Sequence, residues 1–305
     1  MSLCILCPGQ GSQTTDMLTR LLADPLIAPH LQPLLSALPF DALAVSQNSA
    51  ECFANANAQP LIVAAGSAVS QALKSQGIAI GLSAGYSIGE LTAHAVAGSL
   101  APLNAVHLAV QRARHMDKAA PQAHGMMAVK GVRLEQLHDI AQENGLAVAI
   151  VNDDQHAVLA GSSTILKSIC KKLESEYGAH VVHLNVQVPS HTAWLKPATT
   201  AFRVALENTT WNTFECPVLS ALDGSPVETQ AHSVDGLARQ ISEPLQWART
   251  LDLSSEMGAT TYFEVGPGNT LTRMVRERFP NVPARALSEF QTFEGALHWL
   301  RSQNP

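Results

Sequence analysis

Short apolar runs separated by longer amphipathic stretches predict a mixed α/β fold for this chain of 305 residues. The first part of the chain is expected to be mainly helical after a short buried strand, with four prolines between residues 25 and 39 that interrupt the helices. Residues 60–73 are expected to form a helix of the core. The expected elements are strands at 3–6 and from 78–80 onward, and helices within 14–74, at 89–98 and at 102–119.

The pattern changes after residue 124, where short strands and helices alternate in a new order. This order, β-α-β-β-α-β, is that of a ferredoxin-like unit. We therefore expect an α/β chain in which a small ferredoxin-like domain, 125–189, is inserted into a large α/β-hydrolase-like domain with a short parallel sheet, 1–124 and 190–305. The expected elements of the insert are strands at 126–132, 147–151, 156–160 and 180–186, and helices at 134–144 and 162–177.

The last part of the chain returns to longer elements. Residues 223 and 224, an Asp-Gly pair, predict a turn, and a Gly-Pro-Gly segment at 266–268 leads into a helix that carries three arginines. The expected elements are strands at 216–220 and 260–265, a helix at 194–208, and a segment at 237–247 that is broken at Pro244.

Charge and composition narrow the function classes. Charged residues make up 14% of the chain, below the usual ~25%, and the formal net charge is −6. This balance argues against nucleic acid or an anionic membrane as the main partner. The uncharged run 52–73 contains Pro60, Gly66 and six Asn, Gln and Ser residues, which favours a buried loop and helix over a membrane span. The apolar run at the N-terminus is too short for a signal peptide.

Five cysteines without framework spacing fit a reducing, cytoplasmic location. Cys4 and Cys7 form a C-x-x-C pair, but residues three apart on a strand point to opposite faces. We therefore expect core cysteines and no disulfide or metal site there. His180 and His183 are not expected to bind a metal, for the same reason.

Residues 82–90 carry the most specific local signal for chemistry. Gly85 and Gly89 flank Ser87 in a G-x-S-x-G pattern, which is typical of a nucleophile elbow between a strand and a helix. A serine on such a strained turn needs neighbours without Cβ atoms, and the helix N-terminus supplies N–H groups that stabilise an oxyanion. A plain glycine-rich strand–helix turn is the alternative interpretation of this motif alone.

Three further features suggest a site. Arg112 and Arg114 cannot share one helix face, so at least one points inward, toward either a structural carboxylate or a substrate carboxylate. His191 lies where the chain re-enters the large domain, beside any interdomain cleft. The loop Pro8-Gly-Gln-Gly-Ser12 lets the backbone approach a ligand or the serine turn, although an ordinary β–α loop would look similar.

Taken together, these motifs resemble the malonyl-CoA:acyl-carrier-protein transacylases, and the resemblance covers essentially the whole chain. His usually precedes the nucleophile in that family, whereas this chain has Tyr86. The Gly-Tyr-Ser variant is similar to the transacylase (epsilon) subunit of bacterial malonate decarboxylase. The matching segments are Pro8-Gly-Gln-Gly-Ser-Gln13, Gly85-Tyr-Ser-Ile-Gly-Glu90, Gln111-Arg112 with Met116, Val188-Pro-Ser-His191, Arg239-Gln240 ahead of Pro244, and Glu264-Val-Gly-Pro-Gly268.

The resemblance implies an acyl-carrier-protein S-malonyltransferase with a ping-pong mechanism and no bound cofactor or metal. Malonyl-CoA would acylate Ser87, and the thiol of a phosphopantetheine-type arm on an acyl carrier protein would accept the malonyl group. Other malonate decarboxylase subunits are expected partners of that branch. The implied roles are base for His191, backbone oxyanion donors for Gln10 and Ile88, a backbone carbonyl that orients the imidazole for Gln240, and carboxylate binding for Arg112.

Two further positions are expected to contribute to binding. Asn152 matches a recurrent family asparagine and is expected to line the cleft. Arg276, with Arg273 and Arg278, is expected to form a basic patch for an acidic carrier, with a solvated helix face as the alternative.

The competing functions are the same transacylase serving fatty acid or polyketide synthesis, an α/β-hydrolase-type thioesterase with His298 near the C-terminus, and a non-catalytic assembly subunit. The simultaneous presence of Ser87 and His191 argues against the last.

Overall fold

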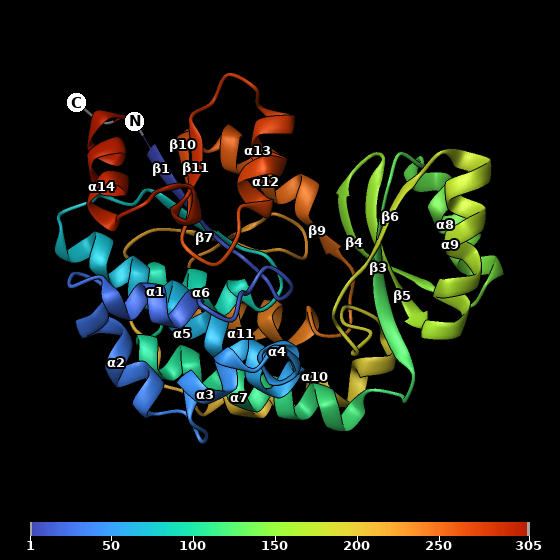
Figure 1. Cartoon of the computed structure of the whole chain (residues 1–305), viewed down its shortest axis with the longest axis horizontal. Coiled ribbons are helices and arrows are strands. Elements are labelled where there is room, and N and C mark those ends of the chain that lie inside the picture. Colours follow the sequence, from blue (N-terminus) through green and yellow to red (C-terminus); the bar gives the residue numbers. More distant parts are fainter. Residues whose placement is uncertain (1, 304–305) are drawn as a thin grey trace.

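A computed structural model describes residues 2–303 as two bodies, and each is built on a sheet (Figure 1). The six-stranded sheet has the order β11-β10-β1-β2-β7-β8, and the five-stranded sheet has the order β6-β3-β5-β4-β9. The mixed α/β class is therefore confirmed. Among the residues that the model describes, no helix combines the length and the apolar character needed to cross a membrane.

The larger sheet is parallel except for the β7–β8 pair. In the register of β1 and β2, Cys7 is opposite Gly85, so the two carboxyl ends lie side by side. In a parallel sheet the loops that leave such ends share one edge, which places the loop at 8–12 beside Ser87. The strands are β1 Ser2–Cys7, β2 Leu82–Gly85, β7 Val218–Leu219, β8 Pro226–Val227, β10 Ala259–Glu264 and β11 Ala284–Ala286.

Helices cover this sheet and enclose the main core. In α5, sixteen residues are buried, and Gly66 brings this helix so close to α6 that a Cβ there would lie 2.8 Å from Thr92 Cγ2. The helices of this body are α1 Met17–Ala23, α2 Ala28–Ser36, α3 Ala42–Gln47, α4 Ser49–Phe53, α5 Asn55–Ser75, α6 Gly89–Val96, α7 Pro102–Ala119, α10 Lys196–Glu207, α11 Gln230–Arg239, α12 Trp247–Glu256, α13 Thr270–Arg278 and α14 Phe293–Ser302.

Alternation along β1 separates the two faces of the larger sheet. Ile5 and Cys7 belong to the helix-covered core, whereas Cys4 and Leu6 pack on the opposite face, toward the smaller body. The expectation that Cys4 and Cys7 point to opposite faces is confirmed, and all five cysteines are free thiols.

The smaller body has the expected element order β-α-β-β-α-β. The two helices cover one face of its sheet, and the other face, which includes Met126 and Ile150, packs toward the larger sheet (Figure 1). The two-residue strand β9, Leu245–Gln246, crosses from the larger body and pairs parallel with β4. The other elements are β3 His124–Lys130, α8 Leu134–Glu143, β4 Ala147–Asp153, β5 His156–Ser162, α9 Ser163–Tyr177 and β6 His180–His183. The domain bounds stay a prediction.

Several expected elements are wrong in their extent. Residues 78–80 are not a strand, because pairing with β1 begins only at Leu82, opposite Cys4. The segment 237–247 contains the end of α11 at Arg239, a turn through Pro244, and then β9, with α12 beginning at Trp247. The core helix begins at Asn55, so Pro60 lies inside it. The short strand β11 and the C-terminal helix α14 were not expected.

Candidate active site

Ser87 lies on a sharp turn between β2 and α6, with a left-handed φ of +57°. A Cβ on Gly85 would lie 2.2 Å from the Glu90 nitrogen, and a Cβ on Gly89 would lie 2.1 Å from the Cys7 carbonyl oxygen. Backbone atoms cannot yield to such overlaps, so both positions require glycine. The steric expectation for the G-x-S-x-G motif is therefore confirmed.

His191 lies within hydrogen-bond distance of Ser87, although 104 residues separate them in the sequence. Its Nε2 is 2.8 Å from Ser87 Oγ, and its Nδ1 is 2.5 Å from the backbone carbonyl oxygen of Gln240. Since a carbonyl oxygen can only accept, Nδ1 carries the proton and Nε2 of the neutral ring accepts from the serine.

Burial and the nearby Arg112 lower the pKa of His191 to about 3. A ring that is 1% exposed loses the solvation that would stabilise its charged form, and the Arg112 cation opposes a second positive charge. His191 is therefore neutral near pH 7 and able to accept a proton from Ser87.

Two backbone N–H groups are available next to Ser87. Within residues 2–303, the amides of Gln10 and Ile88 donate to no protein acceptor, and both residues line the same small cavity as Ser87, of about 50 Å³. The Gln10 side chain donates to the Phe53 carbonyl oxygen at 3.1 Å, which holds the loop in place. Gly9 has no room for a Cβ, which would lie 2.9 Å from the Tyr86 carbonyl oxygen.

Arg112 points inward from α7 and is 2% exposed, whereas Arg114 is exposed. Its Nη2 lies 3.5 Å from Ser87 Oγ. No carboxylate in the described part of the chain forms an ion pair with Arg112, so the structural salt bridge considered from the sequence is absent there. Burial lowers its pKa to about 10, which still leaves it charged at pH 7.

Two glutamine side chains hold the Arg112 guanidinium in place of a carboxylate. Nη1 donates to Gln59 Oε1 at 2.7 Å, and Nη2 donates to Gln240 Oε1 at 3.3 Å. The Gln240 amide nitrogen then donates to Glu90 Oε2 at 3.0 Å. Gln240 therefore contacts the imidazole through its backbone, and the guanidinium and a carboxyl group through its side chain.

Sequence reasoning did not single out Gln59 or Glu90. Glu90 is 1% exposed, and its Oε2 also accepts from the Ala221 amide at 3.0 Å. Burial raises its pKa to about 8, so the carboxyl group is mostly neutral near pH 7. Glu90 was visible as part of the elbow motif, but an uncharged Gln59 inside an uncharged run offers no signal.

Tyr86 connects the serine turn to the smaller sheet. Its hydroxyl donates to Asn152 Oδ1 on β4 at 3.1 Å, and Asn152 Nδ2 lies 3.3 Å from His156 Nε2. The Tyr86 ring also meets Trp247 edge to face, with ring centroids 5.3 Å apart. Tyr86 lines the cavity, whereas Asn152 stands behind it and does not.

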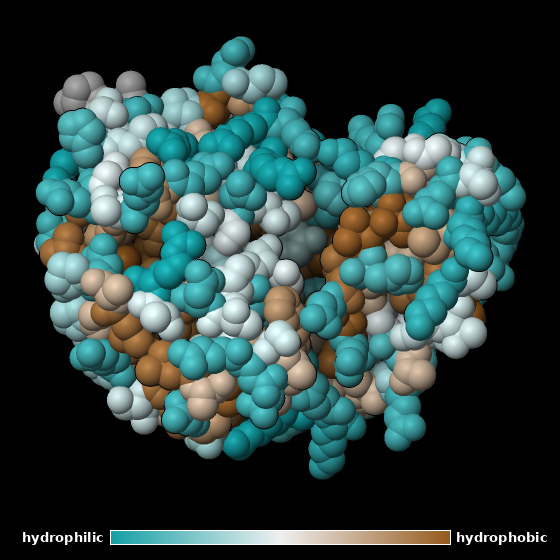
Figure 2. Space-filling view, in the orientation of Figure 1, coloured by the Kyte–Doolittle hydropathy of each residue, from teal (hydrophilic) through white to brown (hydrophobic). Residues whose placement is uncertain are grey.

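The cavity lies between the two bodies. Figure 2 shows hydrophobic side chains of the smaller body facing the hollow between them. Met126, Ile150, Leu184 and Val186 supply the cavity's apolar lining, opposite the polar groups around Ser87. An apolar wall excludes water and strengthens the polar interactions inside.

Arg276 and His298 lie away from this constellation. The guanidinium of Arg276 forms an ion pair with Glu289 at 2.7 Å and donates to the Ala284 carbonyl oxygen, so its donors are used within the fold. Its docking role stays a prediction. His298 is exposed on α14 and lines no part of the cavity.

Comparison with known proteins gives concordant results. The family model described as "Acyl transferase domain" matches residues 5–291. The malonyl CoA-acyl carrier protein transacylase of Escherichia coli K12 is 30% identical over 95% of this chain and 97% of its own length. That of Mycobacterium bovis is 33% identical over 93% and 96%.

Solved structures also resemble this chain over nearly its whole length. The crystal structure of MCAT from Mycobacterium tuberculosis superposes with a TM-score of 0.89 and 31% identity, covering 98% of this chain and 99% of that one. A malonyl-transacylase in complex with a type II PKS acyl-carrier protein gives a TM-score of 0.90 and 26% identity, with complete coverage of both chains.

Proposed function

This chain belongs to the acyl transferase family of malonyl CoA-acyl carrier protein transacylases, and we propose that it moves a malonyl group from malonyl-CoA to an acyl carrier protein through an ester on Ser87. One observation carries the proposal. Ser87 Oγ lies 2.8 Å from an imidazole nitrogen that can take its proton and 3.5 Å from a buried guanidinium that has no carboxylate partner within residues 2–303.

In the first half-reaction, Ser87 Oγ attacks the thioester carbonyl carbon of malonyl-CoA while its proton moves to His191 Nε2. The N–H groups of Gln10 and Ile88 stabilise the oxyanion; losing one such donor typically costs ~3–4 kcal/mol in the transition state. The C–S bond then breaks, and His191 returns the proton to the sulfur of the departing CoA.

Arg112 binds the free carboxylate of the malonyl group. A planar guanidinium pairs with a carboxylate through two parallel hydrogen bonds, and this pairing is strongest where water is excluded. An acetyl group leaves the buried cation without such a partner, so the site favours malonyl over acetyl. The support is the burial of Arg112 and its neutral glutamine neighbours.

The second half-reaction reverses the first with a different thiol. The thiol of the carrier arm gives its proton to His191 Nε2, and its sulfur attacks the ester carbonyl carbon. The C–O bond to Ser87 then breaks, and Ser87 Oγ takes the proton back from His191. The reactants are malonyl-CoA and the carrier arm, and the proposal includes no bound cofactor or metal.

Malonyl-CoA carrying a labelled malonyl group tests the transfer. The protein should move the label to a carrier protein bearing a phosphopantetheine arm and release little free malonate. If the protein instead releases free malonate without any carrier, at a rate equal to that of transfer in its presence, the result would favour a thioesterase. The exposed position of His298, outside the cavity, weighs against that alternative.

We further propose that this transacylase serves malonate decarboxylase, whose other subunits would then be partners. The support is Tyr86, which replaces the family's usual histidine before the nucleophile. Service in fatty acid or polyketide synthesis is equally consistent with the relatives, one of which is bound to a type II PKS carrier. Parallel assays with a phosphopantetheine carrier and with a carrier bearing a dephospho-CoA-derived arm distinguish the branches. A clear preference for the first carrier would contradict the malonate decarboxylase assignment.

We also propose a class for each of the two bodies of the fold. The strand order β6-β3-β5-β4 supports naming the smaller body a ferredoxin-like insert, and the parallel strands behind the serine turn support an α/β-hydrolase-like larger domain. We infer that Asn152 acts through Tyr86, since its side chain reaches the cleft only by that contact.

A further inference from the structure

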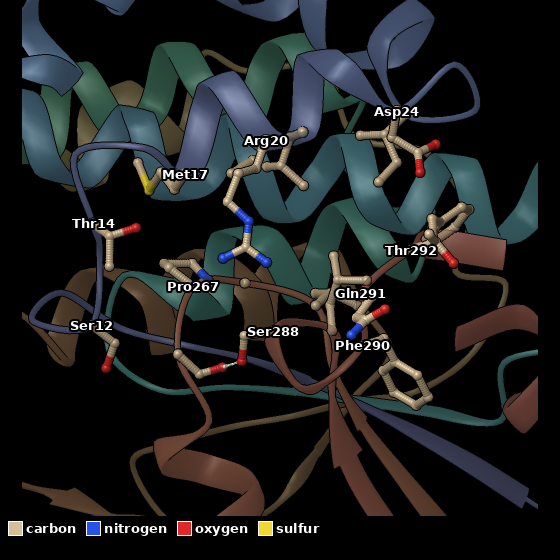
Figure 3. A pocket seen from close by; sticks show the side chains of 18 residues that line it. Ser12, Thr14, Met17, Arg20, Asp24, Pro267, Ser288, Phe290, Gln291 and Thr292 are labelled. Carbon is tan, nitrogen blue, oxygen red and sulfur yellow. Dashed lines mark hydrogen bonds between the residues drawn. The ribbon is translucent and has the colours of Figure 1, made fainter. Parts of the chain in front are cut away.

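A second cavity lies outside the active site. It has a volume of about 240 Å³ and is bounded by α1, the loop at 12–14, the Gly-Pro-Gly loop and the segment 287–293 (Figure 3). It shares no lining residue with the cavity at Ser87. The proposed acyl transfer therefore does not use it.

The floor of this cavity is apolar. Buried side chains of Met17, Ile27, Val265 and Phe293 line it, and Phe290 adds an aromatic edge. A smaller apolar cavity of ~150 Å³ is enough to bind benzene. A cavity of about 240 Å³ therefore has room for a flexible chain of about eight carbons.

Arg20 is the cation that lines this cavity. Figure 3 shows the Arg20 guanidinium reaching from α1 into the cavity, between Pro267 and Gln291. Within residues 2–303, no carboxylate oxygen comes within 4.0 Å of it. Two carboxylates lie nearby: Asp24 accepts from the Leu26 amide at 3.0 Å, and Asp16, one turn before Arg20, accepts from the Thr14 hydroxyl at 2.6 Å.

We propose that this cavity is a second binding site, for an amphipathic monocarboxylate of about eight carbons, whose head group pairs with Arg20 and whose chain lies on the apolar floor. A cation beside an apolar pocket matches a single anionic head on an apolar body. Thr14 and Thr292 also line the cavity, where the Thr14 hydroxyl donates to Asp16 Oδ1 at 2.6 Å and Thr292 Oγ1 accepts from the Gly295 amide at 3.1 Å.

This site lies beside the loop that carries Gln10. Ser12, in the cavity wall, is two residues from Gln10, and its Oγ lies 3.2 Å from Thr270 Oγ1. Gly268 packs so closely on Ser12 that a Cβ there would lie 2.6 Å from the serine Cβ. The cavity therefore borders both the loop that carries Gln10 and the Gly-Pro-Gly loop that packs on Ser12.

Calorimetric titration with octanoate tests the site, using the Ser87→Ala variant so that no ester forms. We expect one saturable site, with affinity rising about fourfold per methylene from butanoate to octanoate. Arg20→Gln should weaken octanoate binding about tenfold. Arg114→Gln, at an exposed arginine of α7, is the matched control and should leave the octanoate affinity unchanged.

Two further titrations show where octanoate binds. Octanol should bind more weakly than octanoate, and saturating malonyl-CoA should leave the octanoate affinity unchanged. Competition by malonyl-CoA, or loss of binding in Arg112→Gln but not in Arg20→Gln, would place octanoate in the active site and overturn the proposal. Absence of saturable binding, or equal affinity for octanol, would also overturn it. These outcomes leave the acyl-transfer proposal untouched.

Discussion

The backbone carbonyl of Gln240 accepts a hydrogen bond from Nδ1 of His191, at the position that a carboxylate occupies in a Ser-His-Asp triad. A carbonyl oxygen orients the ring and fixes its tautomer, but it carries no full negative charge to stabilise an imidazolium. Burial of the ring, together with the nearby Arg112 cation, lowers the pKa of His191 to about 3.

The first prediction concerns pH. Because His191 stays neutral down to low pH, the rate of Ser87 acylation by malonyl-CoA should remain flat between about pH 7 and pH 5. Arg112→Gln removes the neighbouring cation and should move the acidic limb to higher pH. Rapid-quench acylation across this range measures both, with circular dichroism to verify folding. A wild-type limb near pH 6.5, the ordinary value for histidine, would contradict the account.

Arg112→Ala tests the carboxylate clamp. The loss of charged hydrogen bonds should lower kcat/KM for malonyl-CoA by about 10- to 100-fold, while the slow reaction with acetyl-CoA changes little. Arg114→Ala, on the same helix but exposed, provides the control. Equal losses for the two thioesters would remove this role from Arg112.

Gln59→Leu and Gln240→Leu test whether the two amides position the clamp. Each variant leaves one guanidinium nitrogen without its acceptor, while Gln240→Leu keeps the backbone carbonyl that faces His191. Both should reduce the preference for malonyl-CoA and cost about 1–3 kcal/mol of stability, without moving the pH limb of acylation. A shift of the acidic limb, or an unchanged preference for malonyl-CoA, would contradict the role of these amides in positioning Arg112.

Glu264 offers a prediction on stability. Its carboxyl group is fully buried, its Oε2 accepts from the amide and the hydroxyl of Thr272 at 2.8 Å, and burial raises its pKa to about 7. The folded state therefore retains a proton that the unfolded state has lost, and stability falls as pH rises from about 4.5 to 7.

Glu264→Gln removes this titration and keeps an acceptor for Thr272. The variant should gain stability relative to wild type as pH rises, by up to about 3 kcal/mol above pH 7. Urea unfolding at pH 4.5 and pH 8 measures the difference. A constant difference at both values would mean that the carboxyl group titrates normally.

The sequence was most informative where structure is local. The turn at Ser87 follows from steric conflict around Gly85 and Gly89, which any G-x-S-x-G turn must resolve, and the opposite directions of Arg112 and Arg114 follow from helix geometry. His191 could be paired with Ser87 only through the family resemblance, because no local pattern joins residues so far apart.

Contacts between the two bodies were not predictable from local patterns. The Tyr86–Asn152 hydrogen bond joins residues from different bodies, and β9 is too short to show any strand periodicity. Gln59 was missed because its role depends on a cation that arrives from α7. Pairings of this kind depend on tertiary packing, which a single sequence does not reveal.

Intact mass after mixing with malonyl-CoA tests the central claim most directly. The account predicts a covalent adduct of one malonyl group, absent from Ser87→Ala and formed far more slowly in His191→Ala. Addition of a thiol-bearing carrier should remove the adduct and transfer it to the carrier arm. An adduct that persists in Ser87→Ala, or no adduct on the wild-type protein, would contradict acyl transfer through Ser87.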